Sequence, residues 1–326
     1  MRKGGYVEIH DESIEILKNL QSYNGSFPVY PHFSVFNYSN LSEGALCAYA
    51  LDIWGEKNAA RDFYLWAAKK YITKSDTFDF NEDYQLDGYG TFLWGLGKNL
   101  SEDDKDILIT FGETVYIIQK FLFKSWNEAA KQYAIDNKIS IHPAVLACIY
   151  GGLLEINKFY PHQETPSILE NIKAVLKYDY TLNGHFIKTP KQNLIDMKLL
   201  FLLYPFNVFS LKDPIMKATY QEIKNNFNLM EKFTGEHQSE WFILSALLAL
   251  CALQEFDYKF AEQIFNWMQE QANRGGYLQD LVIKQLIYPS VFYETVDRWG
   301  QSEKPFLIHH AFYLILEKEL NKFIKS

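Results

Sequence analysis

Apolar side chains recur with a helical period along most of the chain, and Gly, Pro, Asn and Asp separate the apolar stretches. Stretches with the two-residue alternation of a β-strand are scarce. The pattern predicts about twelve helices. By residue number they are 11–22, 41–54, 57–72, one opening at 85–90, 101–123, 140–157, a short one from Pro166, 194–203, 214–227, 240–254, 258–272 and 305–323.

The predicted connections between these helices alternate in length. Short ones lie at Gly55, 97–101 and 254–257, whereas the long ones carry aromatic and acidic residues. This alternation fits a toroid of paired helices in which the long connections gather at one end and form a site there. A bundle or a solenoid of helical hairpins is the alternative, and the absence of a clear internal repeat argues against the solenoid.

The composition is sufficient for a large hydrophobic core and is rich in aromatic residues. Of the 326 residues 48% are hydrophobic, 22% are charged and 17% are aromatic, which permits one domain or two. Aromatic rings supply stacking faces for ligands as well as core area, so the excess favours a ligand-binding groove only mildly.

Charge and targeting signals exclude several classes of partner. The net charge of −8, without a long run of Lys and Arg, argues against nucleic acid. The acidic residues within positions 8–12 interrupt any signal peptide, and the apolar segments 199–206 and 242–253 are shorter than the ~20 residues of a membrane span. We expect a cytoplasmic protein without a membrane partner.

The three cysteines, Cys47, Cys148 and Cys251, stand within apolar helical patterns and lack the spacing of metal ligands. We predict that they are small buried side chains and that the protein is in a reducing compartment. The dense acidic stretch 76–83 resembles a solvated loop rather than a metal site. We therefore predict no metal and no cofactor.

Several short stretches, in order and with similar spacing along nearly the whole chain, resemble one family. They are Phe-Ser-Val-Phe-Asn-Tyr-Ser at 33–39, Gln-Leu-Asp-Gly-Tyr-Gly at 85–90, Trp-Asn-Glu at 126–128, residues 142–153, Leu-Tyr-Pro-Phe at 203–206, Asp-Pro at 213–214, Glu-Trp at 240–241, Gly-Tyr-Leu-Gln-Asp-Leu at 276–281 and Pro-Phe-Leu-Ile-His-His-Ala at 305–311. Together they are similar to the family-15 glycoside hydrolases: glucoamylases, glucodextranases and related trehalases, with phosphorylase kinase regulatory subunits as distant relatives. The resemblance implies an all-α fold, a single (α/α)6 barrel over residues 1–326.

The resemblance also implies hydrolysis of an α-glucosidic bond with inversion, which needs an acid and a base about 6.5–9.5 Å apart. Asp280 stands where the family has its base, on an arm shorter by one carbon; the alternative is an Asp that caps a turn. The family's acid directly follows the tryptophan, and that position is Asn127, whose amide is no proton donor near neutral pH. Glu128, the next residue, is the candidate acid.

Seven other residues are candidates for binding the sugar: Tyr38, Glu43, Asp87, Trp126, Glu240, Trp241 and His309. Five of them also have a structural explanation. The carboxylates fit helix starts, the tryptophans fit the core, and Ser42-Glu43 fits a helix that begins with a capping serine. Ser42 replaces an arginine that grips sugar hydroxyls in the family.

Two functions from different classes follow. The first is an inverting glycoside hydrolase acting on an oligosaccharide or small α-glucoside, with Asp280 as base and Glu128 as acid. The second is a catalytically inactive carbohydrate-binding or regulatory protein on the same scaffold, which Asn127 and Ser42 favour.

Overall fold

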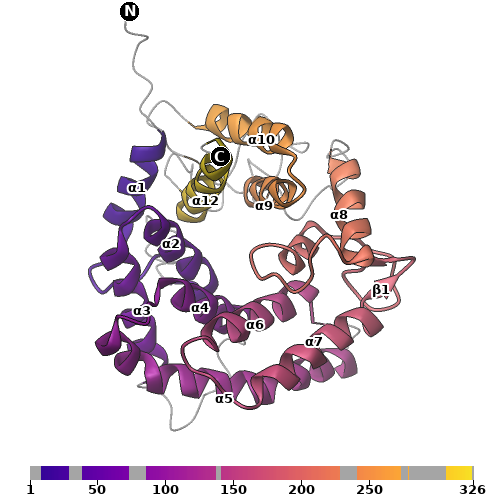
Figure 1. Cartoon of the computed structure of the whole chain (residues 1–326), viewed down its shortest axis with the longest axis horizontal. Helices are drawn as coiled ribbons and strands as arrows, with labels where there is room; N and C mark the ends of the chain where they lie inside the picture. The colour runs from indigo at the N-terminus through magenta and orange to yellow at the C-terminus, as the bar shows by residue number, and fades with distance from the viewer. Residues whose placement is uncertain are drawn as a thin grey trace, which may run out of the picture.

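The computed structural model describes residues 9–28, 39–72, 86–136, 141–227, 241–272, 278 and 306–324. An inner ring and an outer ring of helices account for most of these residues (Figure 1). The inner elements are α2 (Leu41–Ile53), α4 (Leu86–Asn99), α6 (Pro143–Ile156), the 3-10 helix η2 (Met197–Leu202), α9 (Trp241–Gln254) and α12 (Leu307–Ile324). The outer elements are α1 (Ile9–Leu20), α3 (Lys57–Ile72), α5 (Lys105–Asp136), α7 (Thr165–Asp179), α8 (Pro214–Phe227) and α10 (Tyr258–Gln271).

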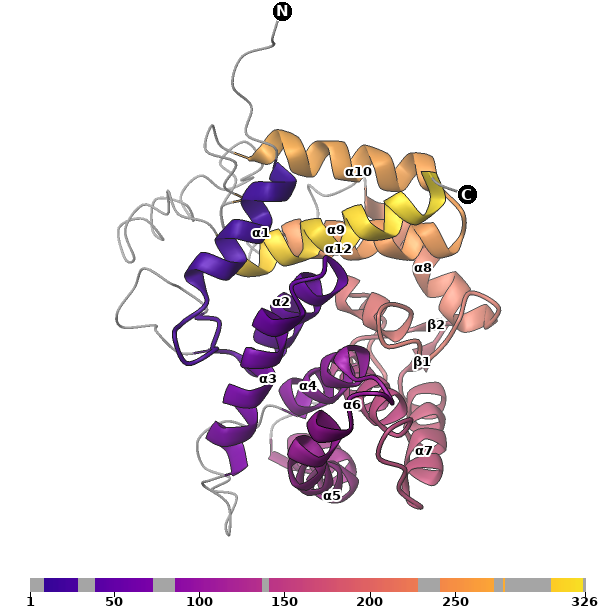
Figure 2. The ribbon, with the colours of Figure 1, turned by 60° about the vertical axis from the view of Figure 1, so that its left-hand side comes forward.

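The inner ring is closed. Each inner element packs against the next one in chain order, and α12 packs against α2. The outer helices lie against this ring, for example α10 on α9 and α12, and Figure 2 shows α12 running beside α1 and α10. The predicted (α/α)6 barrel is confirmed, because inner and outer elements alternate along the chain.

The sequence explains which helices lie inside. α9 carries no charged residue over its fourteen positions and is apolar on all sides, whereas α10 is amphipathic, with one apolar and one polar face. The cysteines Cys47, Cys148 and Cys251 lie on the inner helices α2, α6 and α9, and all three are buried as free thiols, as predicted. Burial raises the pKa of each thiol.

Close approach of α4 and α6 depends on glycine. A Cβ added at Gly152 would lie 2.2 Å from the carbonyl oxygen of Gly90, and one at Gly151 would lie 2.5 Å from the ring of Phe206. Gly152 thus permits the close packing of α6 on α4, and Gly151 leaves room for the ring of Phe206. This contact fixes α4 relative to α6, the two helices that carry much of the site described below.

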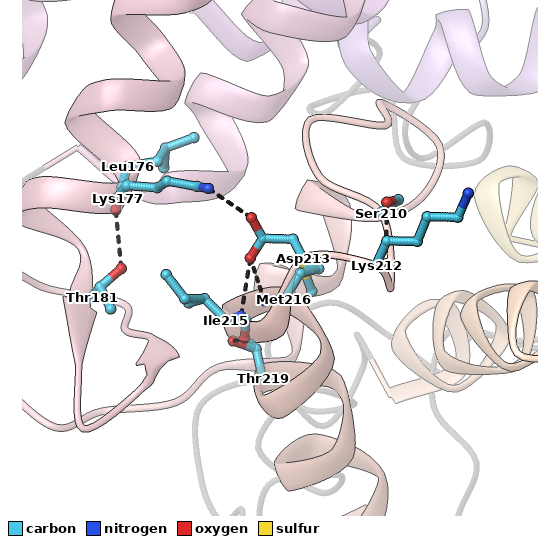
Figure 3. A network of polar contacts seen from close by, with 9 residues as sticks. All are labelled: Leu176, Lys177, Thr181, Ser210, Lys212, Asp213, Ile215, Met216 and Thr219. Atoms are coloured by element: carbon cyan, nitrogen blue, oxygen red, sulfur yellow. Dashed lines mark hydrogen bonds and ion pairs between the residues drawn. The ribbon is translucent and has the colours of Figure 1, made fainter.

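The start of α8 shows how the outer helices are held (Figure 3). Asp213 accepts hydrogen bonds from the backbone N–H groups of Ile215 (3.0 Å) and Met216 (3.3 Å), which caps the helix that Pro214 opens. Its other oxygen lies 2.7 Å from Nζ of Lys177 on α7. These contacts keep the pKa of Asp213 below its ordinary value, although burial alone would raise it.

Four local expectations were wrong. α5 continues to Asp136 instead of ending near Phe123. Residues 178–190, which the sequence predicts as a loop between helices, contain a two-stranded hairpin. Its strands are β1 (Thr181–Leu182) and β2 (His185–Phe186), and its Asn183-Gly184 turn has positive φ at both positions. The predicted helix 194–203 is the shorter η2. Asn40, not Ser42, caps α2, since its Oδ1 accepts the N–H groups of Ser42 and Glu43.

Within the described residues, no helix has both the length and the apolar run required to cross a bilayer.

Candidate functional site

The starts of the inner helices share one end of the barrel. Chain segments of twelve or more residues precede most of them, whereas short turns such as 54–56 and 255–257 lead from inner to outer helices. The alternation seen in the sequence is therefore present, with the longer connection 203–213 as an exception at the other end. Backbone N–H groups at helix starts also give this end a positive potential.

α2 and α4 are joined at this end through two hydroxyl groups. Oγ of Ser42 lies 3.2 Å from Oγ1 of Thr91, and the Thr91 hydroxyl donates to the carbonyl oxygen of Asp87 at 2.8 Å. Because Thr91 uses its only proton in that bond, Ser42 must be the donor between the two hydroxyls. Ser42 therefore links two inner helices.

Asp87 lies in the first turn of α4, where α4, α6 and η2 meet. Burial raises the pKa of its carboxyl, while a hydrogen bond from the N–H of Gly88 and the charge of Lys198 oppose that rise. The Asp87 charge in turn helps to raise the pKa of the Cys148 thiol on α6. Asp87 is only partly buried, and its carboxylate is an acceptor for hydroxyl groups.

His142 caps α6 through one ring nitrogen, and its other ring nitrogen, Nε2, is a hydrogen-bond donor. Its Nδ1 accepts the N–H of Ala144 at 3.0 Å, so the ring proton is on Nε2. Nε2 is buried 3.9 Å from Oδ1 of Asp196, and no described residue accepts its hydrogen bond. Burial lowers the pKa of His142 to about 4, which keeps the ring neutral near pH 7.

Asp196 connects this histidine to η2. Its side chain accepts the N–H of Lys198 at 2.8 Å and lies 3.1 Å from Nζ of Lys188. The nearby His142 and these contacts hold the pKa of Asp196 below its ordinary value despite burial. The site thus combines a neutral imidazole N–H, an ammonium group and carboxylates, a mixture suited to a neutral ligand rich in hydroxyl groups.

The motif at 126–128 lies on α5, an outer helix whose end leads to α6. Trp126 is 5% exposed and packs in the core, whereas Asn127 is exposed. The helix is continuous to Asp136, and the side-chain position of Glu128 lies outside the described part.

Other predicted site residues fall in different surroundings. Glu43 is half-buried in the first turn of α2. His309 is fully buried, with its ring stacked on Phe242 (centroids 4.6 Å apart) and edge-on to Phe306 (4.8 Å). Trp241 opens α9, and its side chain is not described. Tyr38, Glu240 and Asp280 lie outside the described residues.

Sequence reasoning missed His142, Asp196 and Lys198. Their meeting depends on the packing of α6 against η2, which no local pattern records. A signal existed for His142 alone, since a polar residue followed by Pro143 and an apolar run is typical of a helix N-cap.

Comparison with known proteins adds to this geometry. No family model matches the chain. The isomaltose glucohydrolase of Kribbella flavida is 22% identical over 357 residues, spanning 96% of this chain and 92% of that protein. A glycosidase variant in complex with glucose superposes with a TM-score of 0.81, at 23% identity and 96% coverage of both chains. Over nearly its whole length the chain is therefore similar to these glycosidases, and it shares their fold.

A bacterial glucoamylase complexed with acarbose has the same barrel. Its TM-score to this chain is 0.67 at 14% identity, and the match covers 96% of this chain and 55% of the glucoamylase. The shared part is therefore the helical barrel, and the glucoamylase has additional residues outside it. The family fold that the sequence motifs indicate is the fold observed here.

Proposed function

We propose that the protein hydrolyses a small α-glucoside and that the starts of the inner helices hold its non-reducing glucose unit. The observation that carries the proposal is the similarity, over 96% of the chain, to an isomaltose glucohydrolase, together with the fold shared with a glycosidase that binds glucose. The polar groups of Asp87, His142 and Lys198 support it, because they offer both donors and acceptors to sugar hydroxyls.

The proposed mechanism is inverting hydrolysis. Asp280 activates a water molecule on one face of the sugar, and Glu128 protonates the leaving oxygen on the other. The exposed amide of Asn127 is no acid, which leaves Glu128 as the carboxyl group at this motif. Isomaltose is the first substrate to test, given the named activity of the Kribbella relative.

The experiment is a screen for glucose release from isomaltose, maltose, trehalose and an aryl α-glucoside. We expect turnover of at least one substrate and a loss of 10²-fold or more, roughly, in Asp280→Asn and Glu128→Gln. Two exposed residues supply matched controls that should keep full activity: Asp103→Asn, in the connection between α4 and α5, and Glu113→Gln, on α5 itself. Full activity in Asp280→Asn would remove Asp280 from the mechanism.

A second function, binding of a carbohydrate without hydrolysis, is favoured by Asn127 and by the use of Ser42 in a helix–helix contact. It predicts no turnover of any substrate in the screen. Calorimetric titration with glucose and isomaltose would then give a measurable affinity that Asp87→Asn weakens by about tenfold, the loss of one charged hydrogen bond.

A further inference from the structure

We propose that His310 is a positioning residue: as a neutral imidazole it holds the backbone of Leu278, and through it the chain that leads to Asp280. This inference rests on the proposed function, in which Asp280 is the base. His310 itself is fully buried on α12, so in this role it acts through Leu278.

The contacts of His310 join three parts of the chain that are far apart in sequence. Nδ1 lies 2.8 Å from Oγ of Ser13 on α1. Nε2 accepts a hydrogen bond from the backbone N–H of Leu278 at 3.1 Å. The carbonyl oxygen of Leu278 accepts the N–H of Phe306 at 2.9 Å. Both backbone groups of Leu278 are therefore bound to the beginning of α12, and its side chain is fully buried as well.

These contacts fix the tautomer of the ring. A backbone N–H can only donate, so Nε2 must carry a lone pair, and the proton must be on Nδ1. Nδ1 then donates to Ser13, whose hydroxyl is also fully buried. A charged imidazolium would have a proton on both nitrogens and would lose the bond to Leu278. Burial lowers the pKa of His310 to about 3, with a smaller effect from His309, in agreement with a neutral ring.

Leu278, which His310 holds, is close in sequence to the proposed base Asp280. Asp280 lies outside the described residues, but it follows Leu278 by two positions, which limits the distance between their Cα atoms to about 7 Å. A residue that fixes Leu278 therefore limits where the carboxylate of the base can be. Displacement of a reacting group by about 1 Å costs on the order of 10²-fold in rate.

The test compares His310→Leu, which removes the acceptor, with His310→Gln, whose side-chain oxygen can accept the same N–H. We expect kcat on isomaltose to fall by about 10²-fold in His310→Leu with KM within about threefold of wild type, and His310→Gln to recover kcat to within about threefold. His162→Leu is the matched control, because His162 also accepts a backbone N–H, from Glu164 at the start of α7. It should keep wild-type kcat. Equal loss in the leucine and glutamine variants, both folded, would overturn the proposal.

Amide hydrogen exchange separates this proposal from the proposed function. Peptides spanning Leu278 should exchange at least about tenfold faster in His310→Leu than in wild type, whether or not the protein hydrolyses a glucoside. Unchanged protection would overturn the positioning role even in an active enzyme. If wild type hydrolyses no glucoside but His310→Leu still loses protection at Leu278, only the proposed function would be overturned, and the anchoring of Leu278 by His310 would be upheld.

One measurement needs no folded leucine variant. Nitrogen NMR of wild-type protein labelled at histidine, with the His310 signals assigned from His310→Gln, reports the tautomer directly. We expect the Nδ1–H form from neutral pH down to about pH 4, as the low pKa requires. An Nε2–H form or a charged ring at neutral pH would overturn the proposal.

Discussion

The contact between α4 and α6 predicts a large difference between two chemically identical substitutions. In Gly152→Ala the new Cβ would lie 2.2 Å from the carbonyl oxygen of Gly90, about 1 Å closer than an ordinary carbon–oxygen contact. The two inner helices must separate to accept it, and overpacking of this kind costs about 1–3 kcal/mol or more. In Gly112→Ala, on the outer helix α5, the nearest neighbour of the new Cβ is a ring carbon of Tyr160 at 3.9 Å.

Both substitutions gain about 0.5–1 kcal/mol of helix propensity, so this gain cancels in the comparison. The difference between the two variants is then the cost of overpacking, about 1–3 kcal/mol. For a chain of this length it corresponds to about 2–6 °C in Tm, with roughly 2 °C per kcal/mol. Calorimetric and urea unfolding measure both values. Equal stability of Gly152→Ala and Gly112→Ala would refute the close packing of α4 on α6.

Three further predictions concern single side chains. His142→Asn keeps a good N-cap but removes an imidazole whose pKa of about 4 in the folded protein lies below its value in the unfolded chain. Between pH 6.5 and 4 the free energy of unfolding of wild type should therefore fall by about 1.4 kcal/mol per pH unit relative to the variant. Urea unfolding measures this difference, and an equal pH dependence of the two proteins would contradict the prediction. Asn40→Ala should cost about 1 kcal/mol of unfolding free energy, because α2 loses its cap; an unchanged urea midpoint would argue against that cap. Asp87→Asn should weaken glucose binding by about tenfold in calorimetry, and unaltered affinity would place the sugar elsewhere.

Sequence pattern was sufficient for the fold because the inner helices are distinctive. α9 lacks charge altogether, whereas the outer helix α10 carries charged residues among its apolar ones. Helix boundaries were less predictable. α5 continues past Phe123 because residues 124–136 contain neither glycine nor proline to end it. The hairpin at Asn183-Gly184 carries a known turn signal, but its strands have only two residues each.

The site was less predictable than the fold, for a physical reason. Asp87 could be recognised by its position at a helix start, and the structure places it at a junction of three inner elements. His142 and Lys198 come together only through tertiary packing, and their importance depends on burial that a sequence does not display. The same holds for His310, whose partners Ser13 and Leu278 are 297 and 32 positions away in the chain.

The exchange of Ser42 for the family's arginine has a structural explanation. Its hydroxyl donates to Thr91 and so joins α2 to α4, a contact that needs no ligand. The charge of Lys198 lowers the pKa of both Asp87 and His142, so this ammonium group is a donor near both residues. We expect a site formed by Asp87, His142 and Lys198 to bind fewer sugar units than the groove of a glucoamylase binds, in line with a small glucoside as substrate.

The central claim is inverting hydrolysis of an α-glucoside, and the anomer released first tests it most directly. Proton NMR of isomaltose mixed with the wild-type protein should show β-glucose before mutarotation produces the α anomer, and Asp280→Asn should abolish the signal. Release of α-glucose first, or unchanged β-glucose release by Asp280→Asn, would contradict the account.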